Sequence, residues 1–363
     1  MLKITNPFLL VFIIALIFGG VWYFGSLKSA NSSISISTLS TSDSNDPNIA
    51  PDLSGIAGYI NSNSSLSISS LRGKVVLVDF WTYSCINCIR TIPYLTAWDE
   101  KYRDDGLVII GVHAPEFEFE KDYSNVKKAV QKFGINYPVV LDNSFSTWQS
   151  YQNHYWPHKY LIDKSGHIRY DHIGEGNYEE TEQLIQTLLS ENYSGNIDRT
   201  LASSSIVSAN DLSQIRTPEI YLGYGFARAP LGNSEGFRPN KIVNYSISKN
   251  QNFALNRVYF DGEWLNSNDY MELKSQSGKV VLRFKAKNLN IVAGGNATLD
   301  LALDHSPAIN SLGSDAKVVD SNALVTTDSQ RLYSLIDSSD YSEKVLEITV
   351  HGEGFRIYTY TFG

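Results

Sequence analysis

The strongest constraint on the fold of this chain is an apolar run that ends close to two cysteines. Residues 75–81 read Val-Val-Leu-Val-Asp-Phe-Trp. Cys85 follows after three further residues, and two residues separate it from Cys88. A nearly continuous run of β-branched and aromatic residues predicts a central strand that is covered on both faces. Apolar residues at helical spacing after Cys88 predict a helix. Two cysteines with this spacing, between a strand and a helix, are typical of a redox-active dithiol site.

The two cysteines are the only ones among the 363 residues, so no disulfide scaffold holds this fold together. A disulfide that closes so small a loop constrains little of the unfolded chain, which favours a working pair over a structural one. A zinc site is the alternative, but it needs four ligands and the chain has no second pair of cysteines. We therefore expect no cofactor, because the reversible Cys85–Cys88 disulfide is itself the redox group.

The position of each residue suggests its role. Cys85 should lie at the first turn of the helix, where free N–H groups and the helix dipole favour a thiolate, so we expect it to be the nucleophile. Cys88, one turn later, should be more buried and should resolve the mixed disulfide. Asp79 lies within the apolar strand, where burial raises its pKa, and could exchange a proton with Cys88; the alternative is that it faces solvent. Glu116 is a further candidate relay, although a solvated acidic loop is the simpler reading.

The length suggests two domains and connecting segments. Residues 8–24 form an unbroken run of 17 apolar or small residues, near the lower limit for crossing a bilayer. We expect an uncleaved signal anchor over residues 1–28, with the rest of the chain on the extracytoplasmic side of the cell membrane; a cleaved signal peptide is the alternative. Residues 29–50 are rich in Ser and Asn and predict a flexible linker.

Residues 51–195 predict an α/β domain with a central mixed sheet and flanking helices. A β-α-β unit brackets the cysteines, and a hairpin and a closing helix follow. The expected strands are 66–71, 75–81, 107–112, 137–141, 159–163 and 167–173; the expected helices are the one after the cysteines, 124–133, 145–151 and 179–189.

The hydrophobic pattern of the sequence changes after a polar linker over residues 196–216. Residues 217–363 contain short alternating segments separated by Gly, Asn and Ser, which predict a β-sandwich. Trp264 and Tyr224 could stack on a sugar there, although aromatic residues in a sandwich more often belong to the core. The net charge of −8 does not support binding to nucleic acid.

Several motifs resemble the thioredoxin superfamily. The run Asp79-Phe80-Trp81 before Cys85, with Pro93 five residues after Cys88, is similar to the strand and kinked helix of thioredoxin. Residues 71–88 and 155–163 resemble TlpA/redoxin proteins, and among these most closely the soluble part of DipZ-type thiol–disulfide interchange proteins. Ile86-Asn87 replaces the Gly-Pro of thioredoxin, so the redox potential is not carried over.

This resemblance implies a thioredoxin-like fold and a set of residues that position the substrate. These are Trp81, Tyr83, Trp156 and Pro157, with Pro157 after a cis peptide bond. The frequency of cis X–Pro bonds alone would predict a trans bond.

The resemblance also implies partners. It predicts a membrane-anchored oxidoreductase that reduces disulfides of extracytoplasmic proteins. Because this chain has one membrane segment where DipZ-type proteins have many, a separate membrane protein would deliver the electrons. Residues 217–363 resemble a carbohydrate-binding module, so a glycan is a further candidate partner. Two alternatives stay open: a surface glycan- or protein-binding protein with an accessory redox domain, and a thiol peroxidase.

Overall fold

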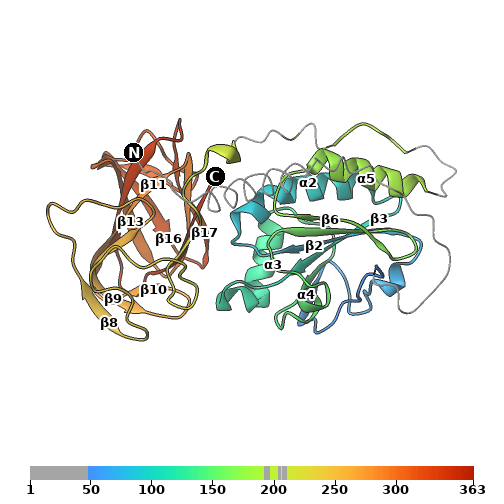
Figure 1. Cartoon of the computed structure of the whole chain (residues 1–363), viewed down its shortest axis with the longest axis horizontal. Coiled ribbons are helices and arrows are strands. Elements are labelled where there is room, and N and C mark those ends of the chain that lie inside the picture. The colour runs from blue at the N-terminus through green and yellow to red at the C-terminus, as the bar shows by residue number, and fades with distance from the viewer. Residues whose placement is uncertain (1–47, 192–196, 203–205, 207–210) are drawn as a thin grey trace, which may run out of the picture. The chain divides into compact units, whose positions relative to one another are not determined.

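A computed structural model describes residues 48–191, 197–202, 206 and 211–363 (Figure 1). Residues 48–363 form one compact unit. The signal anchor expected over residues 1–28, and nearly all of the linker expected over 29–50, lie outside the described residues. Within the described ranges, no helix is both long enough and apolar enough to cross a membrane.

The first half of the unit is built on a mixed sheet whose central strand carries the cysteine motif at its end. In the described residues this sheet has six strands, in the order β1-β4-β3-β2-β5-β6. β2 runs parallel to β3, as the β-α-β unit predicts, and β5 runs antiparallel to β6, as the hairpin predicts. β2 also pairs antiparallel with β5. The strands are β1 Gly58–Ile60, β2 Val75–Trp81, β3 Leu107–His113, β4 Val139–Leu141, β5 His158–Ile162 and β6 Ile168–Ile173.

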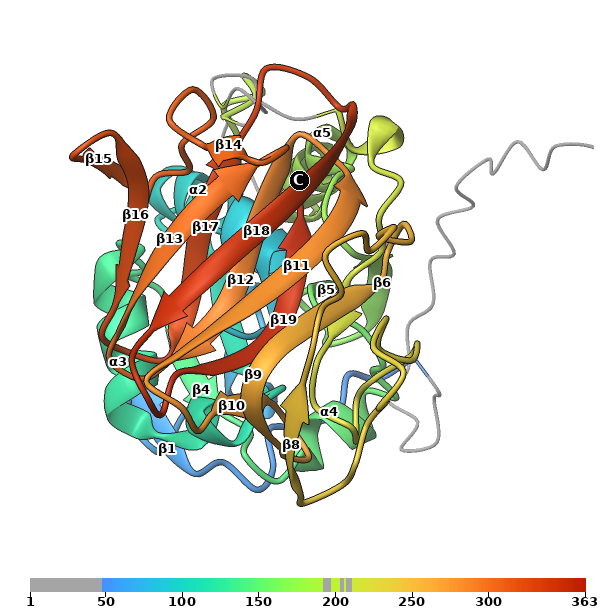
Figure 2. The ribbon, with the colours of Figure 1, turned by 90° about the vertical axis from the view of Figure 1, so that its left-hand side faces the viewer.

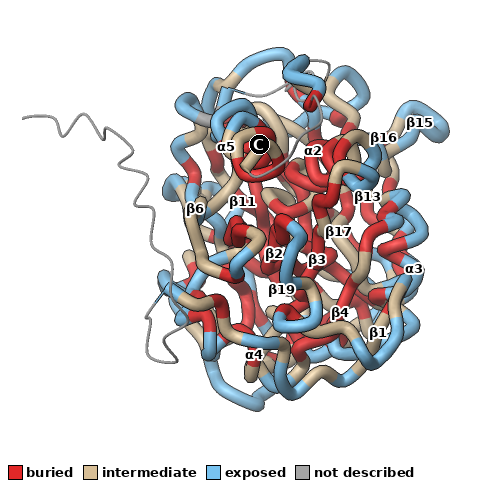
Figure 3. The backbone as a smooth tube through the Cα atoms, turned by 90° about the vertical axis from the view of Figure 1, so that its right-hand side faces the viewer, coloured by how far each residue is buried: buried red, intermediate tan, exposed pale blue. Residues whose placement is uncertain are grey.

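Alternation along β2 divides the core into two layers. Leu77 and Trp81 point to the face covered by α2, α3 and α5, whereas Val78 and Phe80 point to the face covered by α4 (Figure 1). All seven residues of β2 are buried, and β2 and β3 lie at the centre of the buried region in Figure 3. The helices are α2 Ile86–Tyr102, α3 Tyr123–Lys132, α4 Ser146–Ser150 and α5 Tyr178–Ser190.

One expected strand is wrong. Residues 66–71 alternate, but the structure ends this segment in a 3₁₀ turn over Ser69–Leu71. The carboxylate of Asp52 accepts hydrogen bonds from the backbone N–H groups of Ile68 at 2.7 Å and Ser69 at 3.3 Å. A side chain distant in sequence thus takes the donors that a neighbouring strand would need.

A buried carboxylate fixes the cysteine-bearing helix against α5. Glu182 of α5 is fully buried, and it accepts hydrogen bonds from Trp98 Nε1 at 3.0 Å and from the Tyr102 hydroxyl at 2.7 Å. Both donors lie on α2. Because a buried carboxylate without partners is costly, these bonds define how the two helices pack.

The second half of the unit is all-β, but it is not a sandwich of two separate sheets. Its described residues form a single 13-stranded sheet that curls over on itself (Figure 2). The long strand β9 makes the turn: Val258 to Asp261 pair with β11, whereas Trp264 to Asn266 pair with β10. Gly262, at the changeover, has a φ of +98°, which other residues rarely adopt.

The strands of the curled sheet were only partly predicted. The alternating segments 242–247, 253–260, 270–273, 280–286, 297–303, 345–350 and 355–362 correspond to β8, β9, β10, β11, β13, β18 and β19, whereas β7, β12 and β14 to β17 were missed. The full set is β7 Ile220–Tyr221, β8 Ile242–Tyr245, β9 Val258–Asn266, β10 Met271–Leu273, β11 Ser277–Lys285, β12 Asn288–Gly294, β13 Ala297–Leu303, β14 Ser306–Pro307, β15 Lys317–Val319, β16 Asn322–Thr327, β17 Arg331–Asp337, β18 Glu343–His351 and β19 Arg356–Phe362.

Aromatic residues join the two halves of the unit. The ring of Tyr358, on β19, lies 5.1 Å from the ring of Phe117 and 4.8 Å from that of Phe119. Phe117 also contacts Phe226, with 5.8 Å between ring centroids. The Tyr83 hydroxyl donates to the carbonyl oxygen of Gln330 at 3.3 Å. The α/β half and the β half therefore share one apolar cluster.

Gly111 provides a test of how tightly the central strands pack. It pairs with Asp79 across β2 and β3, and a Cβ atom there would lie 2.9 Å from Trp81 Nε1 and 3.3 Å from Tyr137. Overpacking of this kind costs about 1–3 kcal/mol, so we expect Gly111→Ala to lower the free energy of unfolding by that amount in urea titrations. Lys127→Ala, at an exposed position, is the control and should change it by less than about 0.5 kcal/mol. Equal stability of the two variants would contradict this packing.

Candidate active site

The two cysteines lie where the chain passes from β2 into α2. Cys85 is the N-cap residue of α2, and its Sγ accepts a hydrogen bond from the backbone N–H of Cys88 at 3.4 Å. Cys85 is partly exposed, whereas the side chain of Cys88 is 1% exposed. Both are free thiols. The accessible sulfur at the helix N-terminus suits Cys85 as the attacking residue.

Asp79 lies buried beneath the cysteine turn, on the α2 side of the sheet. It is 2% exposed, and its Oδ1 atom has no hydrogen-bond partner within the described part of the chain. Burial raises the pKa of Asp79 to about 7, in the direction that its place in the strand predicts. Burial also raises the pKa of Cys88, and negative charge on Cys85 and Asp79 raises it further. The interior therefore disfavours charge on Asp79 and Cys88 at the same time.

A lysine that the sequence analysis did not select lies opposite Asp79. Lys159 pairs with Asp79 across β2 and β5, and its side chain is fully buried. Its ammonium group donates to the carbonyl oxygen of Gly174 at 2.8 Å. Burial lowers the pKa of Lys159, and negative charge on Asp79 and Cys88 opposes this. The lysine in turn pulls the pKa of Asp79 downward. A charged residue within an apolar strand, the signal that identified Asp79, also marks Lys159.

A second carboxylate holds the residue just before the nucleophile. Ser84 Oγ donates to Glu120, which is fully buried and also accepts from the backbone N–H groups of Glu116 at 2.6 Å and Phe117 at 2.9 Å. Burial raises the pKa of Glu120, and these hydrogen bonds oppose the rise. The acidic segment after β3 is therefore not simply a solvated loop, because one of its carboxylates positions the cysteine turn.

One of the two residues between the cysteines, Asn87, is also held in place. Asn87 Oδ1 accepts a hydrogen bond from Arg90 at 2.6 Å, and Arg90 makes a bidentate ion pair with Glu175 at 2.7 and 2.8 Å. Glu175 precedes α5, so this clamp joins the cysteine turn to the loop before that helix. The sequence does not single out Arg90 or Glu175, because neither residue lies within an apolar run.

Glu116 makes its hydrogen bond with the β half of the unit. Its carboxylate accepts a hydrogen bond from the Tyr221 hydroxyl in the β half, and no hydrogen bond joins it to either cysteine among the described residues. Burial raises the pKa of Glu116 to about 8, and the negative charges of Glu219 and Glu120 contribute. These contacts give no support to Glu116 as a proton relay.

The expected substrate-positioning residues fall into two groups. Trp81 is 1% exposed and packs edge-on against His113 at 5.3 Å, so it does not meet a substrate directly in this structure. Tyr83 is 4% exposed and stacks on His113. Burial lowers the pKa of His113 to about 3, so this histidine is neutral.

Trp156 and Pro157 lie at the same end of the sheet as the cysteine turn, because Phe80 pairs with His158 across antiparallel β2 and β5. The peptide bond between them is cis, as the resemblance implies and against the expectation from X–Pro frequencies. Trp156 Nε1 donates to the Ala114 carbonyl oxygen at 3.0 Å, and its ring packs on Trp148 at 4.4 Å.

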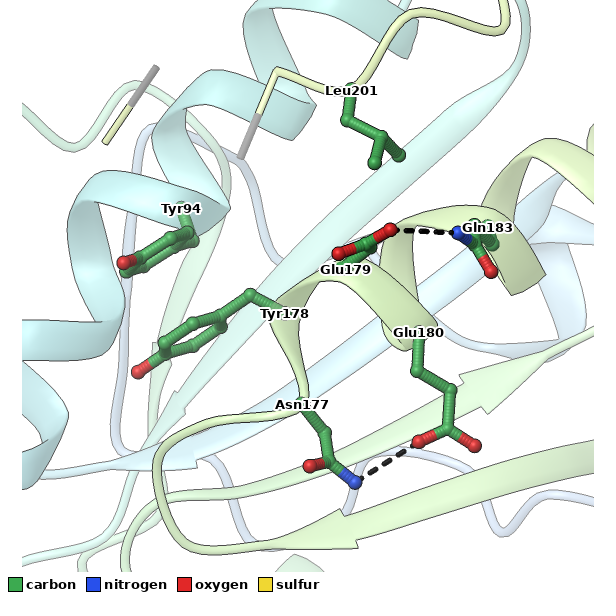
Figure 4. A pocket seen from close by; sticks show the side chains of 7 residues that line it. All are labelled: Tyr94, Asn177, Tyr178, Glu179, Glu180, Gln183 and Leu201. Atoms are coloured by element: carbon green, nitrogen blue, oxygen red, sulfur yellow. Dashed lines mark hydrogen bonds between the residues drawn. The ribbon is translucent and has the colours of Figure 1, made fainter. Parts of the chain in front are cut away.

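The other candidate sites do not include the cysteines. A pocket of about 550 Å³ at the start of α5 is lined by polar side chains and by the stacked rings of Tyr94 and Tyr178, 3.5 Å apart (Figure 4). Neither cysteine lines it. Trp264 is fully buried in the curled sheet and cannot stack on a sugar. In the part of the chain that the structure describes, no group of three His, Cys, Asp or Glu side chains could hold a metal ion.

Comparison with protein families agrees with this site. Residues 45–189 match the family described as Redoxin, and residues 217–363 match the family described as Thioredoxin like C-terminal domain. The chain belongs to the thioredoxin superfamily of thiol–disulfide oxidoreductases, which act through their own cysteines.

Particular relatives cover different parts of the chain. Protein DipZ of Mycobacterium tuberculosis is 36% identical over 320 residues, which are 86% of this chain and 43% of DipZ. This chain therefore spans less than half the length of that relative. Thiol-disulfide oxidoreductase ResA of Bacillus cereus is 30% identical over 123 residues, which are 34% of this chain and 68% of ResA. A solved thioredoxin-like protein in the oxidized form is 27% identical, with a TM-score of 0.37, over 40% of this chain and 96% of that one.

The raised pKa of Asp79 predicts how stability depends on pH. An unfolded aspartate titrates near pH 3.9, but folded Asp79 titrates near 7. Between these values the folded chain holds a proton that the unfolded chain releases, so stability falls as pH rises through this window. Since each pH unit of the window contributes about 1.4 kcal/mol, Asp79→Asn should be more stable than the wild type by about 4 kcal/mol near pH 8.

Urea titrations at several pH values would measure this effect. The advantage of Asp79→Asn should shrink as pH falls from about 7 toward about 4, because the wild-type carboxyl is then neutral as well. Asp104→Asn, an exchange at an exposed position, is the control and should show no such dependence. An Asp79→Asn variant that gains no stability at high pH would contradict the raised pKa.

Proposed function

We propose that this protein is a membrane-anchored, extracytoplasmic oxidoreductase that reduces disulfides in other proteins. The observation that carries the proposal is the asymmetry of the cysteine pair. Cys85 is accessible at a helix N-terminus, while Cys88 is buried above a carboxyl whose pKa is near 7. The Cys85 sulfur is suited to attack the substrate, and the Cys88 sulfur is suited to react once a base has taken its proton.

The reaction takes two steps in this proposal. The Cys85 thiolate attacks one sulfur of the substrate disulfide, and the other substrate sulfur leaves as a thiolate. Cys88 then passes its proton to Asp79 and attacks the Cys85 sulfur. The second substrate sulfur leaves and takes up a proton, and the enzyme is left with a Cys85–Cys88 disulfide. Two electrons have moved from the enzyme to the substrate.

The buried lysine supports this sequence of steps. The Lys159 ammonium lowers the cost of a negative charge on Asp79 or Cys88, and these are the two groups that exchange the proton. Trp156 and Pro157, at the same end of the sheet, would support the backbone of the substrate beside Cys85.

The membrane part of the proposal rests on the sequence. The apolar run over residues 8–24 would anchor the chain, and the domains would face away from the cytoplasm. A separate membrane protein that carries a reduced dithiol would return two electrons to the Cys85–Cys88 disulfide.

Single cysteine variants test the two roles. Cys85→Ser should lose essentially all reduction of a protein disulfide, because no nucleophile remains. Cys88→Ser should accumulate a mixed disulfide between Cys85 and the substrate, because nothing resolves it. Gel electrophoresis without reductant, followed by mass spectrometry, would detect that adduct. Equal activity in the two variants would overturn the assignment, and peroxide consumption that survives in Cys88→Ser would point to a thiol peroxidase.

The reduction potential of the Cys85–Cys88 pair tests the direction of electron flow. We expect a value nearer thioredoxin, at about −270 mV, than DsbA, at about −120 mV. Equilibration of the purified chain with glutathione or dithiothreitol mixtures, read by thiol alkylation, would measure it. A value near about −120 mV would make the protein an oxidant that introduces disulfides.

A further inference from the structure

A cleft of about 700 Å³ lies beside the cysteine turn, and both halves of the compact unit line it. One wall includes Tyr83 and, from the first turns of α2, Ile86 and Ile89; α3 extends it. The other wall comes from β12, β17 and the loops next to them. Neither cysteine lines the cleft, but Ile86 does, and Ile86 directly follows Cys85 in the chain. A ligand in this cleft would therefore lie next to the active-site turn.

The two walls differ in chemistry. Ile86 and Ile89 make the α2 wall partly apolar, whereas the β wall is rich in amides and hydroxyls, from Asn288, Asn290, Ser314, Ser329, Gln330 and Ser334. The Oδ1 atom of Asn288 is buried and has no hydrogen-bond partner within the described ranges. An apolar wall that faces a wall of amides fits an extended peptide, whose side chains contact one wall while its backbone bonds to the other.

The charges that line the cleft are mostly positive. Four cationic side chains line it, against the single carboxylate of Asp315. Two of the four are paired: Arg90 with Glu175 at 2.7 Å, and Arg331 with Asp315 at 2.8 Å. Among the described residues, the remaining two, Lys128 and Lys132 of α3, form no ion pair.

This excess is notable in an acidic protein. The whole chain carries a net charge of −8, so the positive charge that lines this cleft is opposite in sign to the chain as a whole. Positive charge at the rim of a binding site attracts an acidic partner and disfavours a basic one.

We propose that this cleft holds an extended, acidic segment of the polypeptide whose disulfide Cys85 attacks. This inference rests on the proposed oxidoreductase function and adds the class of substrate. It gives the β half a role in the reaction: β12 and β17 form the wall that recognises the substrate, next to the nucleophile.

A pair of peptides tests the proposal. Both contain the same disulfide, which is flanked by Asp residues in one and by Lys residues in the other. The full chain, kept reduced by dithiothreitol, is assayed for kcat/KM on each peptide, and each value is divided by the rate on the small uncharged disulfide of 2-mercaptoethanol. We expect a preference of about tenfold for the acidic peptide at low salt, and a smaller one at about 1 M salt.

Charge variants locate the preference. Lys128→Glu combined with Lys132→Glu should remove or reverse it, whereas Lys127→Glu should keep it, because Lys127 is exposed on the same helix but does not line the cleft. Arg331→Gln removes a charge from the β wall and should lower the preference about threefold. This change tests whether the β half takes part.

The outcomes separate the two proposals. No reduction of any disulfide, the small one included, would overturn the oxidoreductase function. Reduction of the small disulfide with equal rates on both peptides would overturn the cleft as an acidic-peptide site and leave the function in place. The same loss of preference in Lys127→Glu as in the double variant would show a general charge effect and would also overturn it.

Discussion

The site depends on three ionisable groups that share one dry interior. Asp79, Lys159 and Cys88 are each no more than 2% exposed. In such a place charge is costly, so the groups can hold only those charges that their neighbours compensate. The pairing of β2 with β5 aligns the carboxylate with the ammonium, and the first turns of α2 bring the thiol above them. The register of β2 against β5 therefore brings together the groups that take part in the chemistry.

This arrangement restricts the residues around it. Gly111 of β3 pairs with Asp79 of β2, and its lack of a side chain leaves room for the rings of Trp81 and Tyr137. Ser84, Asn87 and the backbone around them are fastened by Glu120 and Arg90, so the cysteine turn is held from two directions. A nucleophile at a helix N-terminus needs that support, because a small movement would take its sulfur away from the backbone N–H of Cys88 that donates to it.

Local patterns predicted the centre of the fold well. The strand before the cysteines, the helix after them and the strand at 107–112 are present, and the buried position of Asp79 follows from its apolar neighbours. Glu120 and Arg90 were not predictable, because their roles come from contacts with residues distant in sequence. β12 was missed because six of its seven residues are buried, which removes alternation, and an irregularity between Leu289 and Asn290 interrupts it. The curled sheet was unpredictable for a related reason: strand patterns give faces, but they do not say which edges pair.

The aromatic cluster around Tyr358 has a consequence for how the chain folds. Phe117 and Phe119, in the loop after β3, are buried partly by a residue from the last strand, β19. The redox half therefore exposes apolar surface until the C-terminal residues are in place. Synthesis proceeds from the N-terminus, so the half that contains the dithiol is synthesised first. It cannot bury this apolar surface until the rest of the chain has been made. Complete folding of the redox half therefore requires the whole chain. Truncation from the C-terminus would leave a redox domain with exposed apolar surface that is prone to aggregate.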